Sequence, residues 1–479
     1  MNWEQLLSTR RSRESTNRSR YSKSTDLRSE FEKDYHRIIG SASFRRLQDK
    51  TQVFPLDKSD FIRTRLTHSL EVSSFAKSLG QNIGENILVY KKDPGFTSQM
   101  KEDICSILQC AGLIHDIGNP PFGHYGEEII REWFERNLPL MQYHGKKISE
   151  ILKPQMREDF YHFEGNAQAL RLVTKLHFLV DEHGMNLTYA LLNTIIKYPV
   201  SSMEINQGSE DIRERKMGYY FADQDVFHEI VTATGTGNRR HPLTFILEAA
   251  DDIAYKTADI EDSFIKGFLS YHKLLEELTE LQKKEEQANR GKSGSFRPAD
   301  QMEELYRRGR QIKVENPETY AVKNWIVKVQ GFLIGCATFG FTSHYNEIME
   351  GKYPYDLFHG TQAQGLMSLL GELAFREVFI SEPIYRMEVT EATMLDFLMN
   401  KFMTAIIKYD DDTQKLNSID ERMVSFISSN YKKAYHYHAK GKSEDYKLYL
   451  RLLLVTDYIC GMTDSYAKRL YQELNAILP

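Results

Sequence analysis

The chain of 479 residues has little of what fibrous, membrane and secreted proteins require. Glycine and proline contribute only 28 and 13 residues, which excludes collagen-like and low-complexity classes. No apolar run approaches the ~18 residues of a membrane-spanning helix, and the N-terminal segment has no apolar stretch typical of a secretory signal. The four cysteines form no Cys-x-x-Cys pair, and a chain of this length does not need disulfides to fold. We therefore predict a reduced, cytoplasmic protein without a membrane anchor.

The chain also has no large excess of charge of either sign, because 62 basic and 67 acidic residues leave a net charge of −5. A site for a polyanion must therefore come from local placement of Lys and Arg. One stretch, residues 9–23 (TRRSRESTNRSRYSK), is locally basic and has no apolar periodicity. It is either a solvated arm or an electrostatic contact to nucleic acid or to an acidic ligand of a neighbouring subunit.

Hydrophobic residues recur mainly with the spacing of one helix face. The clearest stripes cover residues 65–85, 102–115 and 242–259. Alternating strand patterns are few, and no Asn-Gly or Asp-Gly hairpin is flanked by them. We therefore predict an all-α fold with a helical core and a long C-terminal helical lobe.

A polar, turn-rich tract at 283–300 (KKEEQANRGKSGSFRPAD) interrupts the helical pattern. It predicts a surface excursion or a hinge between two helical parts. The expected organisation is a basic N-terminal arm (1–27), a helical core (28–282), the polar tract (283–300) and a helical lobe packed on the core (301–479).

Two histidines and two aspartates lie where helices would bury them. His115 and Asp116 end an apolar stretch, just before a glycine and a Pro-Pro pair that stop a helix. His68 begins the inner face of its stripe, and Asp251 lies within the stripe of 242–259. Taken alone, a His-Asp pair is more often a capped helix end than a metal site. A second buried His and Asp favour a metal site, because an unpaired buried carboxylate costs several kcal/mol.

The types of these side chains indicate which ions would suit them. Imidazole with carboxylate suits Mn, Fe, Ni, Co or Zn, whereas Mg and Ca prefer oxygen ligands alone. Asp252 is rotated by about 100° from Asp251 on a helix, so we expect Asp251 to be the ligand and Asp252 to flank it or to face outward.

His124 and Glu127 follow the Pro-Pro turn at the i, i+3 spacing. On a helix they would share a face, so that the carboxylate fixes the tautomer of the imidazole. A surface His-Glu pair is the alternative interpretation.

Several stretches resemble the bacterial deoxyguanosinetriphosphate triphosphohydrolases (dGTPases) of the HD-domain phosphohydrolase superfamily. The stretches that carry the resemblance are RSEFEKDYHRIIGSASFRRLQDKTQVFPLDKSDFIRTRLTHSLEV (28–72), GLIHDIGNPPFGHYGEE (112–128), FEGNAQALR (163–171), LEAADDIAYKTADIED (247–262) and GMTDSYA (461–467). The resemblance implies that the core (28–282) is of the HD type.

The resemblance implies a metal-dependent enzyme. Its metal ligands would be His68, His115, Asp116 and Asp251, which would hold one divalent ion per subunit: Mn²⁺ or Mg²⁺ first, or else Co²⁺, Ni²⁺, Fe²⁺ or Zn²⁺. His124 and Glu127 would be the acid/base pair. The reaction would be water attack on the α-phosphorus of dGTP or another dNTP, giving the deoxynucleoside and tripolyphosphate. No P-loop motif, which ordinary NTPases use, is present.

The resemblance also implies substrate contacts. Arg65 and Lys197 match phosphate-contacting positions, and Tyr255 and Asp259 continue the helix face of Asp251. A Tyr255 ring beside the sugar would crowd a 2′-hydroxyl, while Asp259 would bond the 3′-hydroxyl. The complete set of expected contacts is Gln52, Val53, Arg65, Asn166, Lys197, Tyr198, Tyr255 and Asp259.

Family members form tetramers or hexamers, which implies a homo-oligomer here. The aromatic C-terminal lobe supports it, since exposed rings need cover: Tyr431, Tyr435, Tyr437, Tyr446 and Tyr449. Single-stranded DNA is a further expected partner, through the basic arm, and a membrane is not. Two other functions stay open: another HD-type nucleotidase, or a nucleotide- or nucleic-acid-binding regulator with a decayed metal site.

Overall fold

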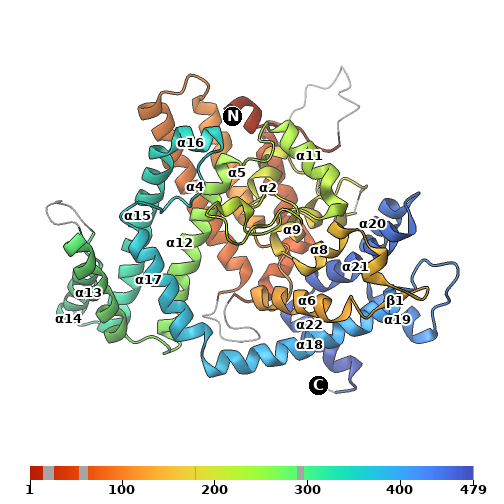
Figure 1. Cartoon of the computed structure of the whole chain (residues 1–479). Coiled ribbons are helices and arrows are strands. Elements are labelled where there is room, and N and C mark those ends of the chain that lie inside the picture. Colours follow the sequence, from red (N-terminus) through yellow and green to blue (C-terminus); the bar gives the residue numbers. More distant parts are fainter. Residues whose placement is uncertain (14–25, 53–62, 179, 289–295, 478–479) are drawn as a thin grey trace.

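The protein is all-α, as the sequence predicts. Its structure, a computed structural model, describes residues 1–13, 26–52, 63–178, 180–288 and 296–477 (Figure 1). Among these residues the only paired strands are β1 (Gln142–Tyr143) and β2 (Lys146–Lys147), which form an antiparallel hairpin. The helices are α1 Trp3–Leu6, α2 Glu30–Ile39, α3 Ala42–Arg46, α4 Arg65–Asn86, α5 Ser98–Ile114, α6 Gly123–Asn137, α7 Ile148–Ile151, α8 Pro154–Tyr161, α9 Gly165–Arg171, α10 Tyr189–Thr194, α11 Gln224–Ala233, α12 Pro242–Ile265, α13 Tyr271–Ala288, α14 Pro298–Gln311, α15 Pro317–Ser343, α16 Tyr345–Glu350, α17 Gln364–Ala374, α18 Glu382–Ile406, α19 Ser418–Phe426, α20 Ser429–Ala439, α21 Glu444–Cys460 and α22 Asp464–Leu474. Short 3₁₀ turns cover Leu47–Asp49, Ile212–Glu214 and Phe221–Asp223, and π-helical turns cover Ile87–Lys91, Leu172–Leu176 and Phe375–Phe379.

The three predicted stripes become α4, α5 and α12, which pack on one another at the centre of the molecule. The inward residues of α4, such as Val72, Ala76 and Leu79, are fully buried. A Cβ at Gly112 would lie 2.5 Å from the Cα of Ser73, so only glycine permits this approach of α5 to α4. Close packing of these three helices is what brings their polar residues together.

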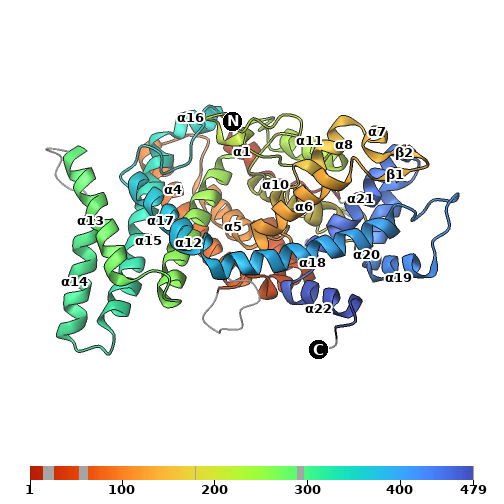
Figure 2. The same ribbon diagram turned by 60° about the horizontal axis from the view of Figure 1, so that its bottom comes forward.

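The C-terminal helices pack against the helices of the core. Helix α15 packs against α4 and α12, while α18 lies along α6 and contacts α21 and α22 (Figure 2). From Leu448 to Cys460, every residue of α21 is buried. The part after residue 300 therefore shares one hydrophobic core with the part before it.

Among the described residues, only α15 is long and apolar enough to cross a membrane. Length and composition alone are weak evidence for a membrane span, because the core helices of globular proteins meet the same criterion. Here α15 packs against α4, α12 and α14, and its residues Val322, Val329 and Leu333 are fully buried.

The polar tract 283–300 was only partly predicted. Residues 283–288 continue α13, and α14 begins at Pro298, so the two helices form a hairpin at the edge of the molecule (Figure 1). Lys, Glu and Gln are good helix formers, which is why a polar sequence extends α13. The remaining part, 289–295, lies outside the described residues.

The prediction of a basic arm over 1–27 is wrong for residues 1–13. Trp3 and Leu6 in α1 are 1% and 0% exposed, and the Trp3 indole N–H donates to the Tyr345 hydroxyl at 2.7 Å. Arg11 forms an ion pair with the buried Asp34 at 2.5 Å. The prediction was based on the charge of the segment and did not consider the apolar residues Trp3 and Leu6, which anchor α1 in the core. Residues 14–25 lie outside the described part, and DNA binding by the arm stays a prediction.

Candidate active site

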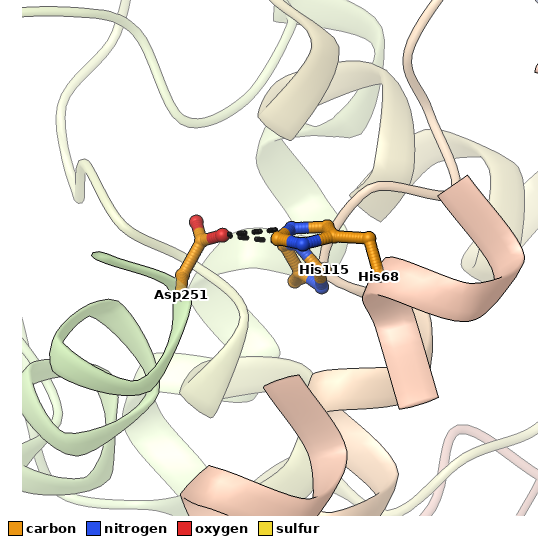
Figure 3. A group of neighbouring side chains, drawn as sticks. All are labelled: His68, His115 and Asp251. Carbon is orange, nitrogen blue, oxygen red and sulfur yellow. Dashed lines mark hydrogen bonds and ion pairs between the residues drawn. The ribbon is translucent and has the colours of Figure 1, made fainter. Parts of the chain in front are cut away.

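Three predicted metal ligands meet where α4, α5 and α12 converge. His68 lies in the first turn of α4, His115 directly follows α5, and Asp251 lies in the middle of α12 (Figure 3). The Asp251 Oδ1 atom is 3.1 Å from His68 Nε2 and 3.4 Å from His115 Nε2. The potential ligand atoms of the three residues all lie within 4.8 Å of one another. One ion could therefore contact all three.

The tautomer of His115 fits this role. The imidazole Nδ1 is 2.8 Å from the carbonyl oxygen of Gly112, which fixes the proton on Nδ1. The Nε2 atom is buried and has no hydrogen-bond partner among the described residues. Its lone pair faces Asp251, as in a metal site whose histidine is oriented by a backbone carbonyl. Two imidazoles with a carboxylate suit a transition metal.

Asp116, the fourth predicted ligand, lies at the edge of this cluster. Its Oδ1 is 3.6 Å from His115 Nε2 and accepts a hydrogen bond from the Asn119 amide at 3.0 Å. Its other oxygen is paired with the Arg65 guanidinium. Burial by itself would raise the pKa of Asp116, but Arg65 and His115 hold it below its usual value. The carboxyl is therefore ionised and available to a cation.

Lys197 contacts the cluster directly. Its ammonium is 2.8 Å from Asp251 Oδ2, the oxygen that faces away from the histidines. Burial opposes both charges, yet Lys197 together with His115 and His68 keeps the pKa of Asp251 well below its usual value. In turn, Asp251 raises the pKa of Lys197 despite burial. The lysine expected at the phosphates thus stands beside a predicted metal ligand.

A cavity of about 400 Å³ opens over this cluster. Nine of the residues predicted from the sequence line it: Gln52, Arg65, Asp116, His124, Asn166, Lys197, Tyr198, Asp251 and Tyr255. Behind this wall lie His68, His115 and Glu127, all buried. Val53 lies outside the described residues.

Asp252 also lines the cavity, so the alternative that it faces outward is wrong. Burial raises the pKa of its carboxyl to about 7. It flanks the cluster without joining it, because one residue along α12 turns its side chain away from the histidines.

The predicted acid/base pair forms at the start of α6. His124 Nδ1 is 3.3 Å from Glu127 Oε2, and the other Glu127 oxygen accepts the Gly165 N–H at 2.9 Å. Glu127 is 1% exposed, whereas the His124 side chain is 73% exposed, so the pair joins a buried carboxylate to an imidazole at the mouth of the cavity. The hydrogen bond to Glu127 raises the pKa of His124, and the pKa of Glu127 falls to about 2 because His124 outweighs the effect of burial.

Gly165 of the EGN motif is required for this geometry. A Cβ there would lie 2.1 Å from Asn119 Oδ1 and 2.5 Å from Glu127 Oε1. Only glycine lets the start of α9 donate its backbone N–H to the Glu127 carboxylate.

Tyr255 and Asp259 lie on the expected face of α12 but at different depths. Tyr255 lines the cavity, whereas Asp259 is 4% exposed and lies outside its lining. Burial raises the pKa of Asp259 well above its usual value, while its hydrogen bond with Tyr255 opposes the rise. In this structure Asp259 interacts with Tyr255, and its contact with a 3′-hydroxyl stays a prediction.

Comparison with known proteins agrees with this geometry. The HD domain matches residues 65–201. The "deoxyguanosinetriphosphate triphosphohydrolase-like protein" of Listeria innocua is 47% identical over 479 residues and covers 100% of both chains. The protein of the same name from Synechocystis is 33% identical over 493 residues, again covering 100% of both. The "deoxyguanosinetriphosphate triphosphohydrolase" of Yersinia pestis is 31% identical over 494 residues, covering 93% of this chain and 94% of the other.

The chain belongs to the deoxyguanosinetriphosphate triphosphohydrolase family. It is thereby a hydrolase of the HD phosphohydrolase superfamily, as the sequence motifs predicted. HD domains bind divalent metal ions, and the His68–His115–Asp251 cluster offers the ligands for one.

In this family member, the C-terminal lobe supplies part of the cavity wall. The sequence analysis did not predict these lining residues. Ile384, Glu388 and Glu391 of α18 line the cavity, although no motif marks them. Lys216 also lines it, from the segment between α10 and α11, with its ammonium 2.9 Å from Glu164. An amphipathic pattern predicts which face of α18 is buried but not which cavity it borders.

Asp464 lies at the start of α22, in the family-like stretch GMTDSYA, and forms hydrogen bonds to two segments of the chain that carry cavity-lining residues. One oxygen accepts the Phe122 N–H at 2.9 Å, and the other accepts the N–H and the hydroxyl of Thr51 at 2.8 and 2.7 Å. Phe122 has a left-handed backbone with φ of 65° and immediately precedes α6. Beside it, the buried Lys50 ammonium donates to the carbonyl oxygens of Asn119 and Cys460, both at 2.6 Å. These contacts fix the segments that carry Gln52 and His124.

Proposed function

We propose that the chain hydrolyses dGTP, and other dNTPs, to the deoxynucleoside and tripolyphosphate. The observation that carries this proposal is one shared cavity: Asp251 of the metal-ligand cluster, His124 and three cations line it, and the partners His68, His115 and Glu127 are buried behind the wall. A metal ion held by His68, His115 and Asp251 would lower the pKa of water and polarise a phosphoryl oxygen.

The cations suit a polyphosphate. Arg65, Lys197 and Lys216 line different parts of the cavity and can oppose the roughly four negative charges of a triphosphate. A nucleoside monophosphate would need fewer positive charges, which favours the triphosphate over the nucleotidase alternative.

His124 is placed to act as general acid. Its Nδ1 is held by Glu127, which directs Nε2 away from that carboxylate, and its raised pKa favours the protonated ring. As the oxygen of water bonds to the α-phosphorus, the bond from phosphorus to the 5′-oxygen breaks. That oxygen takes the proton from His124 Nε2 and leaves as the deoxynucleoside hydroxyl.

The Tyr255 ring gives a physical basis for the deoxyribose. The ring lies in the cavity wall, and its hydroxyl interacts with Asp259. A ribose 2′-hydroxyl placed against this ring would lose its hydrogen bond to water, because the ring carbons offer no hydrogen-bond partner. We therefore expect NTPs to be poor substrates.

The test is incubation with each of the four dNTPs and four NTPs in the presence of Mn²⁺, with products separated by anion-exchange chromatography. We expect deoxynucleoside and tripolyphosphate in equal amounts, dGTP being among the substrates. Asp251→Asn protein prepared in parallel controls for contaminating phosphatases. Orthophosphate or pyrophosphate as the first product, or no product, would contradict the proposal.

A further inference from the structure

A second cavity, of about 370 Å³, lies next to the proposed active site. Basic side chains dominate its polar lining: Arg131, His162, Arg215 and Lys216, with Glu164 the one carboxylate among the described lining residues. Such an excess of positive charge in a concave site attracts anions.

Lys216 borders both cavities. Its ammonium is 2.9 Å from Glu164 Oε2, and the other oxygen of this 2% exposed carboxylate accepts a hydrogen bond from Asn166 at 2.7 Å. The single negative charge of the second cavity is therefore already paired. The ammonium stands in the wall between the two spaces, where an anion could pass from one to the other.

Arg131 and Arg215 supply the unbalanced positive charge. Arg131 is anchored by a hydrogen bond of 3.0 Å to the Phe163 carbonyl oxygen, and its charge, like that of Lys216, lowers the pKa of Glu127. Arg215 is exposed and forms no hydrogen bond or ion pair with the residues that the structure describes. Its guanidinium can thus meet phosphate oxygens with two parallel N–H groups.

We propose that this second cavity binds a short linear polyphosphate, namely the tripolyphosphate released from the neighbouring active site. The inference rests on the proposed function for the identity of the anion. No Phe, Tyr or Trp side chain is among the described residues of its lining, so a nucleobase would find no ring to stack on. Passage along Lys216 would clear the product from the metal-ligand cluster.

Arg215 gives a clean test, because its exposed, uncommitted side chain can be replaced without disturbing the fold. Calorimetric titration of the full chain with tripolyphosphate, without added metal, should show binding. In Arg215→Gln protein the dissociation constant should rise about fivefold, and in Arg215→Glu more than tenfold, since a contact to a charged phosphate is lost or reversed. Arg157→Gln, which changes an α8 arginine outside the cavity lining, should bind as the wild type does.

Steady-state kinetics complete the test. Arg215→Gln should keep kcat and KM for the dNTP within about twofold, while inhibition by added tripolyphosphate weakens about fivefold, in step with binding. Unchanged tripolyphosphate affinity in both Arg215 variants, or no binding to the wild type, would overturn the inference. Absence of dNTP cleavage would instead overturn the proposed function, and the calorimetric comparison would remain interpretable.

Discussion

At the scale of the residue, two adjacent carboxylates of α12 have different surroundings. Asp251 contacts both histidines and Lys197, whereas Asp252 only borders the cavity. We expect Asp251→Asn to abolish turnover and to weaken Mn²⁺ binding strongly, because an anionic ligand is lost. Asp252→Asn should retain Mn²⁺ and lose about tenfold in activity through orientation of its neighbours. Metal content after dialysis and initial rates measure both effects; the reverse ranking would contradict the assignment of ligands.

His124 is the second test at this scale. His124→Gln should lower kcat by about 10²–10⁴-fold, because the proton donor to the leaving oxygen is lost, while Mn²⁺ binding stays the same. His144→Gln is the matched control, since His144 is also partly exposed and paired with a carboxylate, Asp411, but lies outside the cavity. A kcat of His124→Gln protein close to that of the control would remove His124 from the mechanism.

Glu391 predicts a pH dependence of stability. It is 1% exposed, and burial, together with Asp464 and Glu388, raises the pKa of its carboxyl from 4.5 to about 8. Between these pH values the folded chain holds a proton that the unfolded chain has released. The free energy of unfolding should therefore fall as pH rises through this window, by at most about 1.4 kcal/mol per pH unit, and level off above it.

Denaturant titrations from pH 5 to pH 9 measure this effect. Glu391→Gln should become more stable relative to the wild type as pH rises from 5 to 8, because glutamine does not ionise. Glu382→Gln, at an exposed position at the start of the same helix, should follow the wild type at every pH. Parallel curves for the wild type and Glu391→Gln would show that Glu391 does not hold its proton.

At the scale of the element, the start of α22 positions two segments of the cavity wall that lie far away in the sequence. Asp464→Ala removes three hydrogen bonds to Thr51 and Phe122. We expect kcat to fall about tenfold or more while Mn²⁺ binding persists, since misplacement of about 1 Å is enough for such a loss.

A control variant at the same helix end distinguishes an effect on the position of Thr51 and Phe122 from an effect on the stability of the fold. Thr463→Ala removes the N-cap of α22, whose hydroxyl accepts the Tyr466 N–H, but no contact to Thr51 or Phe122. It should cost about 1 kcal/mol of unfolding free energy and little activity. Equal kcat losses in folded Asp464→Ala and Thr463→Ala proteins would assign Asp464 a structural role only.

At the scale of the whole molecule, the expected homo-oligomer needs a different argument from the aromatic lobe. Of the five tyrosines, Tyr431, Tyr435 and Tyr449 are 6%, 4% and 0% exposed, so the chain covers them itself, while Tyr437 is 49% exposed. Apolar side chains elsewhere remain uncovered: Val327 and Phe339 of α15 are 67% and 63% exposed. Exposed apolar side chains on one helix favour contact with another copy of the chain.

Light scattering tests the oligomer. We expect a mass corresponding to a tetramer or hexamer of the 55.8 kDa chain at micromolar concentration. Phe339→Ser should shift the mass towards smaller species if α15 is an interface, whereas Val180→Ser, outside the described helices, should not. A monomeric wild type would contradict the prediction.

The sequence by itself determined the helices and most of the residues that the structure brings together in the candidate site. Helical periodicity is local, so residues 65–85 and 242–259 predicted α4 and α12, and the faces that carry His68 and Asp251 followed from 3.6 residues per turn. The short spacing of His124 and Glu127 likewise predicted their contact on one turn of α6. Such relations need only neighbours along the chain.

Only the tertiary structure decided which partner each polar group meets. Asp464 and Thr51 are separated by 413 positions, and Lys197 and Asp251 by 54. Neither pairing follows from a helical period, because each depends on how several helices pack around a common core. The cavity wall from α18 and the second cavity beside Lys216 arise in the same way. Local patterns specify the direction of a side chain within its helix, whereas close packing of distant helices determines what it faces.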